Sequence, residues 1–120
     1  MSNKTLVIGA SLKEERYSNR AIKRLRSFQH PVVAIGLRNG SVLDVQIEKG
    51  KPEFNDIHTV TMYINPSRQP EYYDYIISLQ PKRVIFNPGT ENPEFYSILE
   101  KSGIQYEQAC TLVLLATNQY

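Results

Sequence analysis

The chain has 120 residues, of which 41% are hydrophobic and 22% charged, and this composition excludes a disordered chain and predicts one globular domain, residues 1–120. The net charge of +2 is spread along the chain, which disfavours nucleic acid as a partner. The single cysteine, Cys110, excludes an internal disulfide, and no apolar run approaches the ~20 residues that cross a bilayer. With no signal-sequence pattern at its start, we expect a soluble cytoplasmic protein.

The first part of the chain alternates short apolar runs with a helical stretch. Residues 6–8 form a continuous apolar run that ends at Gly9, a pattern typical of a strand buried on both faces. Residues 18–27 have helical periodicity with Ser18 as the expected N-cap, and residues 32–35 form a second apolar run. These features predict a strand, a helix and a second strand.

The middle of the chain is less regular. We expect a short extended piece at residues 45–47, with no helix before the β-branched third strand at residues 57–64. A helix bounded by Pro70 and Pro81 follows, and residues 83–86 form the fourth strand. The crossover after the second strand is therefore expected to be irregular or very short.

The last part of the chain completes the alternation. Pro93 begins a helix that ends near Gly103, and residues 104–107 begin a fifth strand. Residues 110–116 form either a terminal helix or a last apolar segment packed on the sheet. Strands that alternate with helices predict an α/β fold, a doubly wound parallel sheet of about five strands flanked by helices.

The first strand runs into the small residues Gly9, Ala10 and Ser11, and a helix follows the next loop. In open α/β sheets this junction commonly holds the phosphates of a nucleotide, because a helix N-terminus presents free N–H groups. The loop departs from Gly-x-Gly-x-x-Gly, since Ser11 and Glu14 occupy the later positions. Taken alone, it is more typical of a turn made small for packing.

The end of the second strand narrows the ligand class. Domains that bind NAD place an acidic residue about 20 residues past the glycines to hold the ribose hydroxyls. This chain instead has Gly36, Leu37, Arg38 and Asn39. Arg38 suits a ribose that carries a phosphate, so the 2′-phosphate of NADP and the 3′-phosphate of coenzyme A both remain; an exposed loop arginine is the alternative.

A turn after the fourth strand adds a possible second wall. In a 3-2-1-4-5 strand order, the first and fourth strands flank the switch point where ligands bind. The turn that contains Asn87, Pro88, Gly89 and Thr90 then faces the first loop. The Asn87 side chain and the Thr90 N–H are candidate ligand contacts, and a simple turn with an N-cap is the alternative.

Together these elements resemble the small stand-alone CoA-binding domains, close to the first domain of succinyl-CoA synthetase α subunits. The matching segments are residues 7–11, Arg16, residues 58–63, residues 87–92, Gly103-Ile104 and Cys110. The resemblance implies a Rossmann-like fold with CoA or an acyl-CoA in the switch-point crevice. The implied cofactor-binding residues are Gly9, Ala10, Ser11, Arg16, Tyr17, Ser18, Gly36, Arg38, Asn39, Tyr63, Asn65, Asn87, Pro88, Gly89 and Thr90.

One departure from the family loop bears on phosphate binding. Glu15 stands where these domains commonly have a glycine, just before the arginine. A carboxylate at this position opposes a phosphate unless it turns outward or pairs with Arg16 or Lys13.

No acid, base or nucleophile stands out for catalysis. His30 precedes Pro31 in an expected surface turn, His58 begins a strand, and Cys110 is either a buried apolar residue or a thiol able to pair with CoA. The leading hypothesis is therefore a non-catalytic CoA or acyl-CoA sensor or carrier. The alternatives are an NADP-dependent reductase, an acyl-CoA-using transferase, and a vestigial module that acts through protein contacts.

A run of tyrosines bears on possible protein partners. Tyr72, Tyr73 and Tyr75 cannot all face the core from one helix. Either one or two of them form the surface of a homodimer or a partner-protein interface, or all are half-buried.

Overall fold

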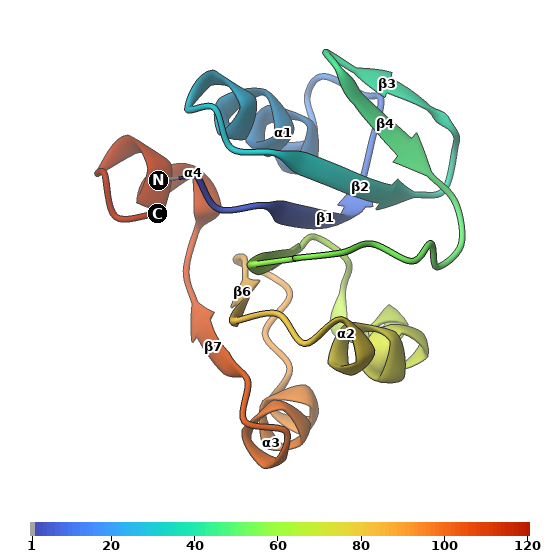
Figure 1. Ribbon diagram of the computed structural model, residues 1–120, viewed down its shortest axis with the longest axis vertical. Coiled ribbons are helices and arrows are strands. Elements are labelled where there is room, and N and C mark those ends of the chain that lie inside the picture. Colours follow the sequence, from blue (N-terminus) through green and yellow to red (C-terminus); the bar gives the residue numbers. More distant parts are fainter. Residues whose placement is uncertain (1) are drawn as a thin grey trace.

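The computed structural model describes residues 2–120 and contains a seven-stranded sheet between two layers of helices (Figure 1). The strand order is β3-β4-β2-β1-β5-β6-β7, and all pairs are parallel except β3 with β4. The strands are β1 Thr5–Ala10, β2 Val32–Gly36, β3 Gly40–Val42, β4 Val45–Glu48, β5 Thr59–Met62, β6 Arg83–Phe86 and β7 Gln105–Gln108. The helices are α1 Tyr17–Ser27, η1 Pro66–Arg68, η2 Pro70–Tyr72, α2 Tyr73–Leu79, α3 Pro93–Lys101 and α4 Thr111–Ala116, where η marks a 3₁₀-helix. The predicted Rossmann-like class is confirmed, with more strands than the five expected.

The two additional strands form a hairpin in place of a crossover helix. β3 pairs antiparallel with β4, and β4 pairs parallel with β2 through Ala34 and Ile47. Residues 45–47, expected only as an extended piece, thus belong to a strand of the main sheet. The β3 strand was not predicted, because its turn places Leu43 in the left-handed region (φ +53°), where glycine or asparagine is the usual signal.

Each face of the sheet has its own hydrophobic core. Alternate residues of β1 point to opposite faces: Leu6 and Ile8 join the core beneath α2 and α3, and Val7 joins the core beneath α1 and α4. Residues 111–116 are helical and pack beside α1, which resolves the open question about the terminal segment in favour of a helix.

The strand order places the switch point elsewhere than predicted. β5 pairs with both β1 and β6, so the expectation that the first and fourth strands flank the switch point is wrong. After the hairpin extends the sheet beyond β2, the chain crosses back and adds β5 to the free side of β1. The carboxyl ends of β2, β1, β5 and β6 therefore lie next to one another, in that order, along one edge of the sheet.

One local prediction is wrong, and the open question about the tyrosines is resolved in favour of half-burial. Arg16, not Ser18, is the N-cap residue of α1, and no side chain caps this helix. Tyr72, Tyr73 and Tyr75 are all half-buried; the Tyr73 hydroxyl donates to Glu94 and the Tyr75 hydroxyl to the Pro52 carbonyl. None of the helices in residues 2–120 is long and apolar enough to span a membrane.

Candidate functional site

A cleft of about 700 Å³ runs along the carboxyl ends of β2, β1, β5 and β6. All of the predicted site residues except Asn39 and Asn87 line it. It is lined in addition by residues that were not predicted: Leu12, Lys13, Ile35, Leu37, Ile64, Arg68 and Tyr72. The cleft therefore lies at the edge of the sheet where α/β domains bind ligands.

Two glycines bring the strand ends that form the floor of the cleft close together. Gly9 has φ +96° and interrupts the β1–β2 register, and a Cβ there would lie 2.9 Å from the Tyr63 carbonyl carbon. A Cβ at Gly36 would lie 2.4 Å from the Ala10 carbonyl oxygen. Glycine is thus required at both positions because neighbouring strands approach too closely there for a Cβ. The same two positions leave little side-chain bulk at this edge of the sheet.

The loop after β1 is held against α1 and leaves donors free. Asn19 Nδ2 donates to the Ser11 carbonyl over 2.9 Å, and the Lys13 N–H donates to Ser11 Oγ over 3.1 Å. The N–H groups of Tyr17 and Ser18 meet no acceptor within residues 2–120, and the first turn of α1 contains no acidic residue. This helix end offers two N–H donors and an uncompensated positive dipole to an anion.

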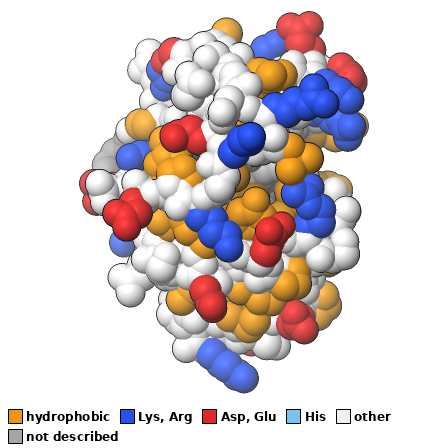
Figure 2. All heavy atoms as spheres, turned by 90° about the vertical axis from the view of Figure 1, so that its right-hand side faces the viewer, with side chains coloured by type: hydrophobic (Ala, Val, Ile, Leu, Met, Phe, Trp, Pro, Cys, Tyr) orange, Lys and Arg blue, Asp and Glu red, His pale blue; other side chains and the backbone are white. Residues whose placement is uncertain are grey.

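The charge on the cleft wall has one sign. Four cationic side chains line it, namely Lys13, Arg16, Arg38 and Arg68, and no carboxylate does. None of the four belongs to an ion pair within the described part of the chain. Figure 2 shows basic side chains gathered toward the upper right of one face of the molecule. The field in the cleft therefore attracts an anion.

The two acidic residues in the first loop do not enter the cleft. Glu15 is exposed and is absent from the lining of the cleft. Its carboxylate therefore turns outward, as phosphate binding in the cleft requires. Glu14 pairs with Lys23 at 3.2 Å on the surface of α1.

The turn after β6 contributes its backbone and small side chains, but two predicted contacts there are wrong. The Asn87 side chain is buried, where it donates to Thr61 Oγ1 and the Met62 carbonyl and accepts from the Thr111 N–H. The Thr90 N–H donates to the Asn87 carbonyl. Both groups were expected to face the ligand, and tertiary hydrogen bonds that the local sequence does not reveal use them instead.

Two other predicted ligand contacts either lie outside the cleft or offer no reactive group to it. Asn39 is exposed beyond Arg38. Tyr63 lines the cleft, but its hydroxyl is buried, and burial raises the pKa of this phenol well above its usual value, so it stays protonated. Within residues 2–120, no three His, Cys, Asp or Glu side chains gather in a manner that suits a metal ion.

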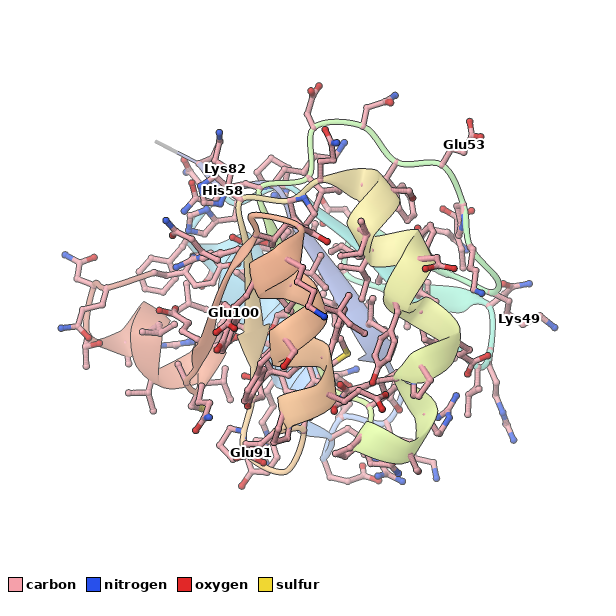
Figure 3. The ribbon with its side chains drawn as sticks, turned by 90° about the horizontal axis from the view of Figure 1, so that it is seen from below. Lys49, Glu53, His58, Lys82, Glu91 and Glu100 are labelled. Atoms are coloured by element: carbon pink, nitrogen blue, oxygen red, sulfur yellow. The ribbon has the colours of Figure 1, made fainter. Side chains whose placement is uncertain are left out.

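The histidines lie at the other end of the sheet. Figure 3 shows His58 beside Lys82 at one end of the molecule and Glu91 at the opposite end. His30 is only 8% exposed, and its Nδ1 accepts from the Asn3 N–H, so the expected surface turn is wrong. Both histidine rings make hydrogen bonds to neighbouring protein groups, and neither lines the cleft.

Comparison with known proteins assigns the chain to a family. The model of the CoA binding domain family matches residues 3–116. The chain belongs to the CoA-binding domain family. The resemblance seen in the sequence is therefore confirmed, and CoA is the ligand class to which the family points.

Solved structures show the same fold. A crystal structure of a protein described as uncharacterized is 44% identical, covers 100% of this chain and 99% of its own, and superimposes with a TM-score of 0.96. The cell-free ID.343 protein from Thermus thermophilus (18% identity, 99% and 91% coverage, TM-score 0.85) shares the fold. A hypothetical protein from Pyrococcus horikoshii OT3 also shares it (24%, 93% and 80%, TM-score 0.84). No curated protein matches the chain.

Proposed function

We propose that this protein binds coenzyme A or an acyl-CoA without catalysing a reaction, and acts as a sensor or carrier of that ligand. The observation that carries the proposal is the cleft across the strand ends, lined by four cationic side chains and no carboxylate, in a chain of the CoA-binding domain family. Its volume of about 700 Å³ falls within the usual range of ligand pockets.

The chemistry of the lining fits the parts of CoA. The N–H groups of Tyr17 and Ser18, with the Arg16 guanidinium beside them, suit the pyrophosphate. Arg38, at the end of β2, suits a phosphate on the ribose. The β6 side of the cleft, formed by residues 88–90, carries no charge and suits the neutral pantetheine arm.

Two features favour this function over the alternatives. The lining contains no carboxylate, histidine or cysteine, so its serine and threonine hydroxyls have no neighbouring histidine or carboxylate in the cleft that could activate them as nucleophiles. Arg38 would serve the 2′-phosphate of NADP equally well, but the family favours CoA. A cytoplasmic location and a homodimer remain predictions.

A thermal-shift experiment on the full chain tests the ligand class. We expect the unfolding midpoint to rise by several degrees with CoA and acetyl-CoA but not with NAD or NADPH, because a ligand that binds only the folded state stabilises it. A response to NADPH alone would show a reductase-type cofactor site. No response to any of the four would favour a vestigial module.

The phosphate assignment has its own test. Replacing Arg16 by Ala removes a charged donor, and a charge-assisted hydrogen bond of about 1.5–3 kcal/mol corresponds to at least roughly tenfold weaker CoA binding. Arg24→Ala is the matched control, since Arg24 is exposed on the same helix and lies outside the cleft. Equal CoA affinities for the two variants, measured by calorimetry, would contradict the assignment.

A further inference from the structure

A second cavity of about 370 Å³ adjoins the cleft where β4 ends. The two spaces share Gly36, Leu37, Arg68 and Tyr72 in their linings, so they lie side by side. The second cavity is completed by residues 49–51, which follow β4 directly, and by Glu71 from η2. It lies on the β2 side of the cleft, the side that carries Arg38.

The charge in this cavity is predominantly positive. Lys49, Lys51 and Arg68 line it against the single carboxylate of Glu71. Neither lysine belongs to an ion pair within residues 2–120. Lys51 Nζ lies 5.6 Å from the centroid of the Tyr72 ring, which holds an ammonium group over the boundary between the two cavities.

The β3–β4 hairpin accounts for the position of these lysines. β4 runs parallel to β2, with Glu48 opposite Ile35, so Lys49 and Gly36 leave the sheet side by side. A crossover helix after β2 would have carried this part of the chain onto a face of the sheet. The hairpin instead returns it to the carboxyl edge, where Gly50, with φ +82° and open space around it, turns the backbone between the two lysines.

We infer that the second cavity binds a phosphate monoester on the ribose of the ligand, which in CoA is the 3′-phosphate. This inference rests on the proposed function. A phosphate monoester is close to a dianion at neutral pH and matches several cations that have no anionic partner in the protein. Lys49 and Lys51, together with Arg38 on the adjoining cleft wall, are therefore determinants of specificity that distinguish CoA from dephospho-CoA, while Arg16 and the α1 N-terminus hold the pyrophosphate common to both.

Calorimetric titration of the full chain with CoA and with dephospho-CoA tests the inference. We expect CoA to bind at least roughly tenfold more tightly, as two or three exposed charge pairs permit. The double variant Lys49→Gln with Lys51→Gln should lower this preference to about twofold and leave the affinity for dephospho-CoA nearly unchanged. The matched control, Lys82→Gln with Lys101→Gln, removes the same charge from exposed positions outside both cavities and should keep the preference; Figure 3 shows Lys82 far from Lys49.

The outcomes separate this inference from the proposed function. If wild-type protein binds CoA and dephospho-CoA equally, or if the double variant keeps the preference, the second cavity is not the phosphate site although CoA binding stands. If neither compound binds, the proposed function fails as well. A parallel titration with NADPH and NADH tests whether the phosphate is instead the 2′-phosphate of NADP. If the two lysines favoured NADPH over NADH by a larger factor than they favour CoA over dephospho-CoA, the assignment to the 3′-phosphate would be overturned.

Discussion

Gln69 and Asn92 are joined by a buried hydrogen bond in which the Asn92 side-chain amide donates to Gln69 Oε1 over 2.8 Å. Gln69 Nε2 donates in turn to the Ile64 carbonyl (3.1 Å) and the Thr90 carbonyl (2.8 Å). Asn92 also caps α3 by accepting from the Phe95 N–H. The loop after β5 and the turn after β6 thus form one wall of the cleft, held by a single buried glutamine.

The first prediction concerns Gln69, which is fully buried. Replacing it by Ala leaves two backbone carbonyls and an amide without their partner, and we expect the free energy of unfolding to fall by about 3 kcal/mol. Urea denaturation measures the loss. Gln108→Ala, at an exposed position of β7, should change the same quantity by less than about 0.5 kcal/mol. If Gln69→Ala lowered the free energy of unfolding no more than this small amount, the network would be unimportant for stability.

The second prediction separates the two costs of a side chain at Gly9. Gly9 and Gly89 have nearly the same φ, +96° and +93°, but a Cβ at Gly89 meets no atom within 4 Å. Gly89→Ala should cost about 1–2 kcal/mol for the left-handed backbone alone. Gly9→Ala should cost at least about 1 kcal/mol more, because its Cβ overlaps the Tyr63 backbone. Equal losses in thermal unfolding would mean that the strand ends relax freely.

The third prediction assigns Asn87 to stability. Asn87→Ala removes three buried hydrogen bonds that connect β6 to β5 and to the start of α4, and should lower the free energy of unfolding by about 2–4 kcal/mol. Asn39→Ala provides the contrast, since Asn39 is exposed and lies outside the cleft. It should alter neither the urea midpoint nor the affinity for CoA; a weaker affinity would restore Asn39 to the site.

The fourth prediction is a loss of stability in mild acid. Burial and the nearby Arg83 lower the pKa of His30 and of His58 below the ordinary value of 6.5. Below pH 6.5 the unfolded chain binds protons that the folded protein resists, so the free energy of unfolding should fall as the pH decreases through 6.5 toward the folded pKa values. Chemical denaturation between pH 7.5 and roughly pH 5 measures the slope.

The matched variant for the acid effect is His30→Gln with His58→Gln. It removes both titrating rings, and the slope between these pH values should become flatter than in the wild-type protein. An unchanged slope would assign the acid sensitivity to other groups.

Much of the fold follows from local patterns. The runs at residues 6–8, 32–35 and 84–86 are apolar without alternation, as strands buried on both faces require, and each lies in a strand of the sheet. Pro93 begins α3 as expected, because its missing N–H is one that the first turn leaves unpaired. The β3–β4 hairpin was only partly predicted, because its turn places Leu43 in a left-handed conformation where a glycine is the usual sequence signal.

The cleft was predicted less completely than the fold. Gly9, Ser11 and Arg38 line it because each follows a predicted strand at the carboxyl edge. Arg68 and Tyr72 were not predicted to line the cleft. Asn65, Pro66 and Pro70 indicated a break after β5. They did not indicate that two 3₁₀ turns bring the following residues back to the cleft. Asn87 was misplaced because a side-chain amide suits a ligand and a buried network equally well.

By itself, the sequence determined the class of fold and the loop that follows the first strand, because burial on two faces and small residues at a strand end leave local signatures. It also determined that no acidic residue follows β2. Only the tertiary structure decided the strand order, the direction of Glu15 and the meeting of Arg16, Arg38 and Arg68 around one cleft. Those features depend on which strands pair and how the intervening segments return to the sheet, and such long-range contacts leave no periodic signal in the chain.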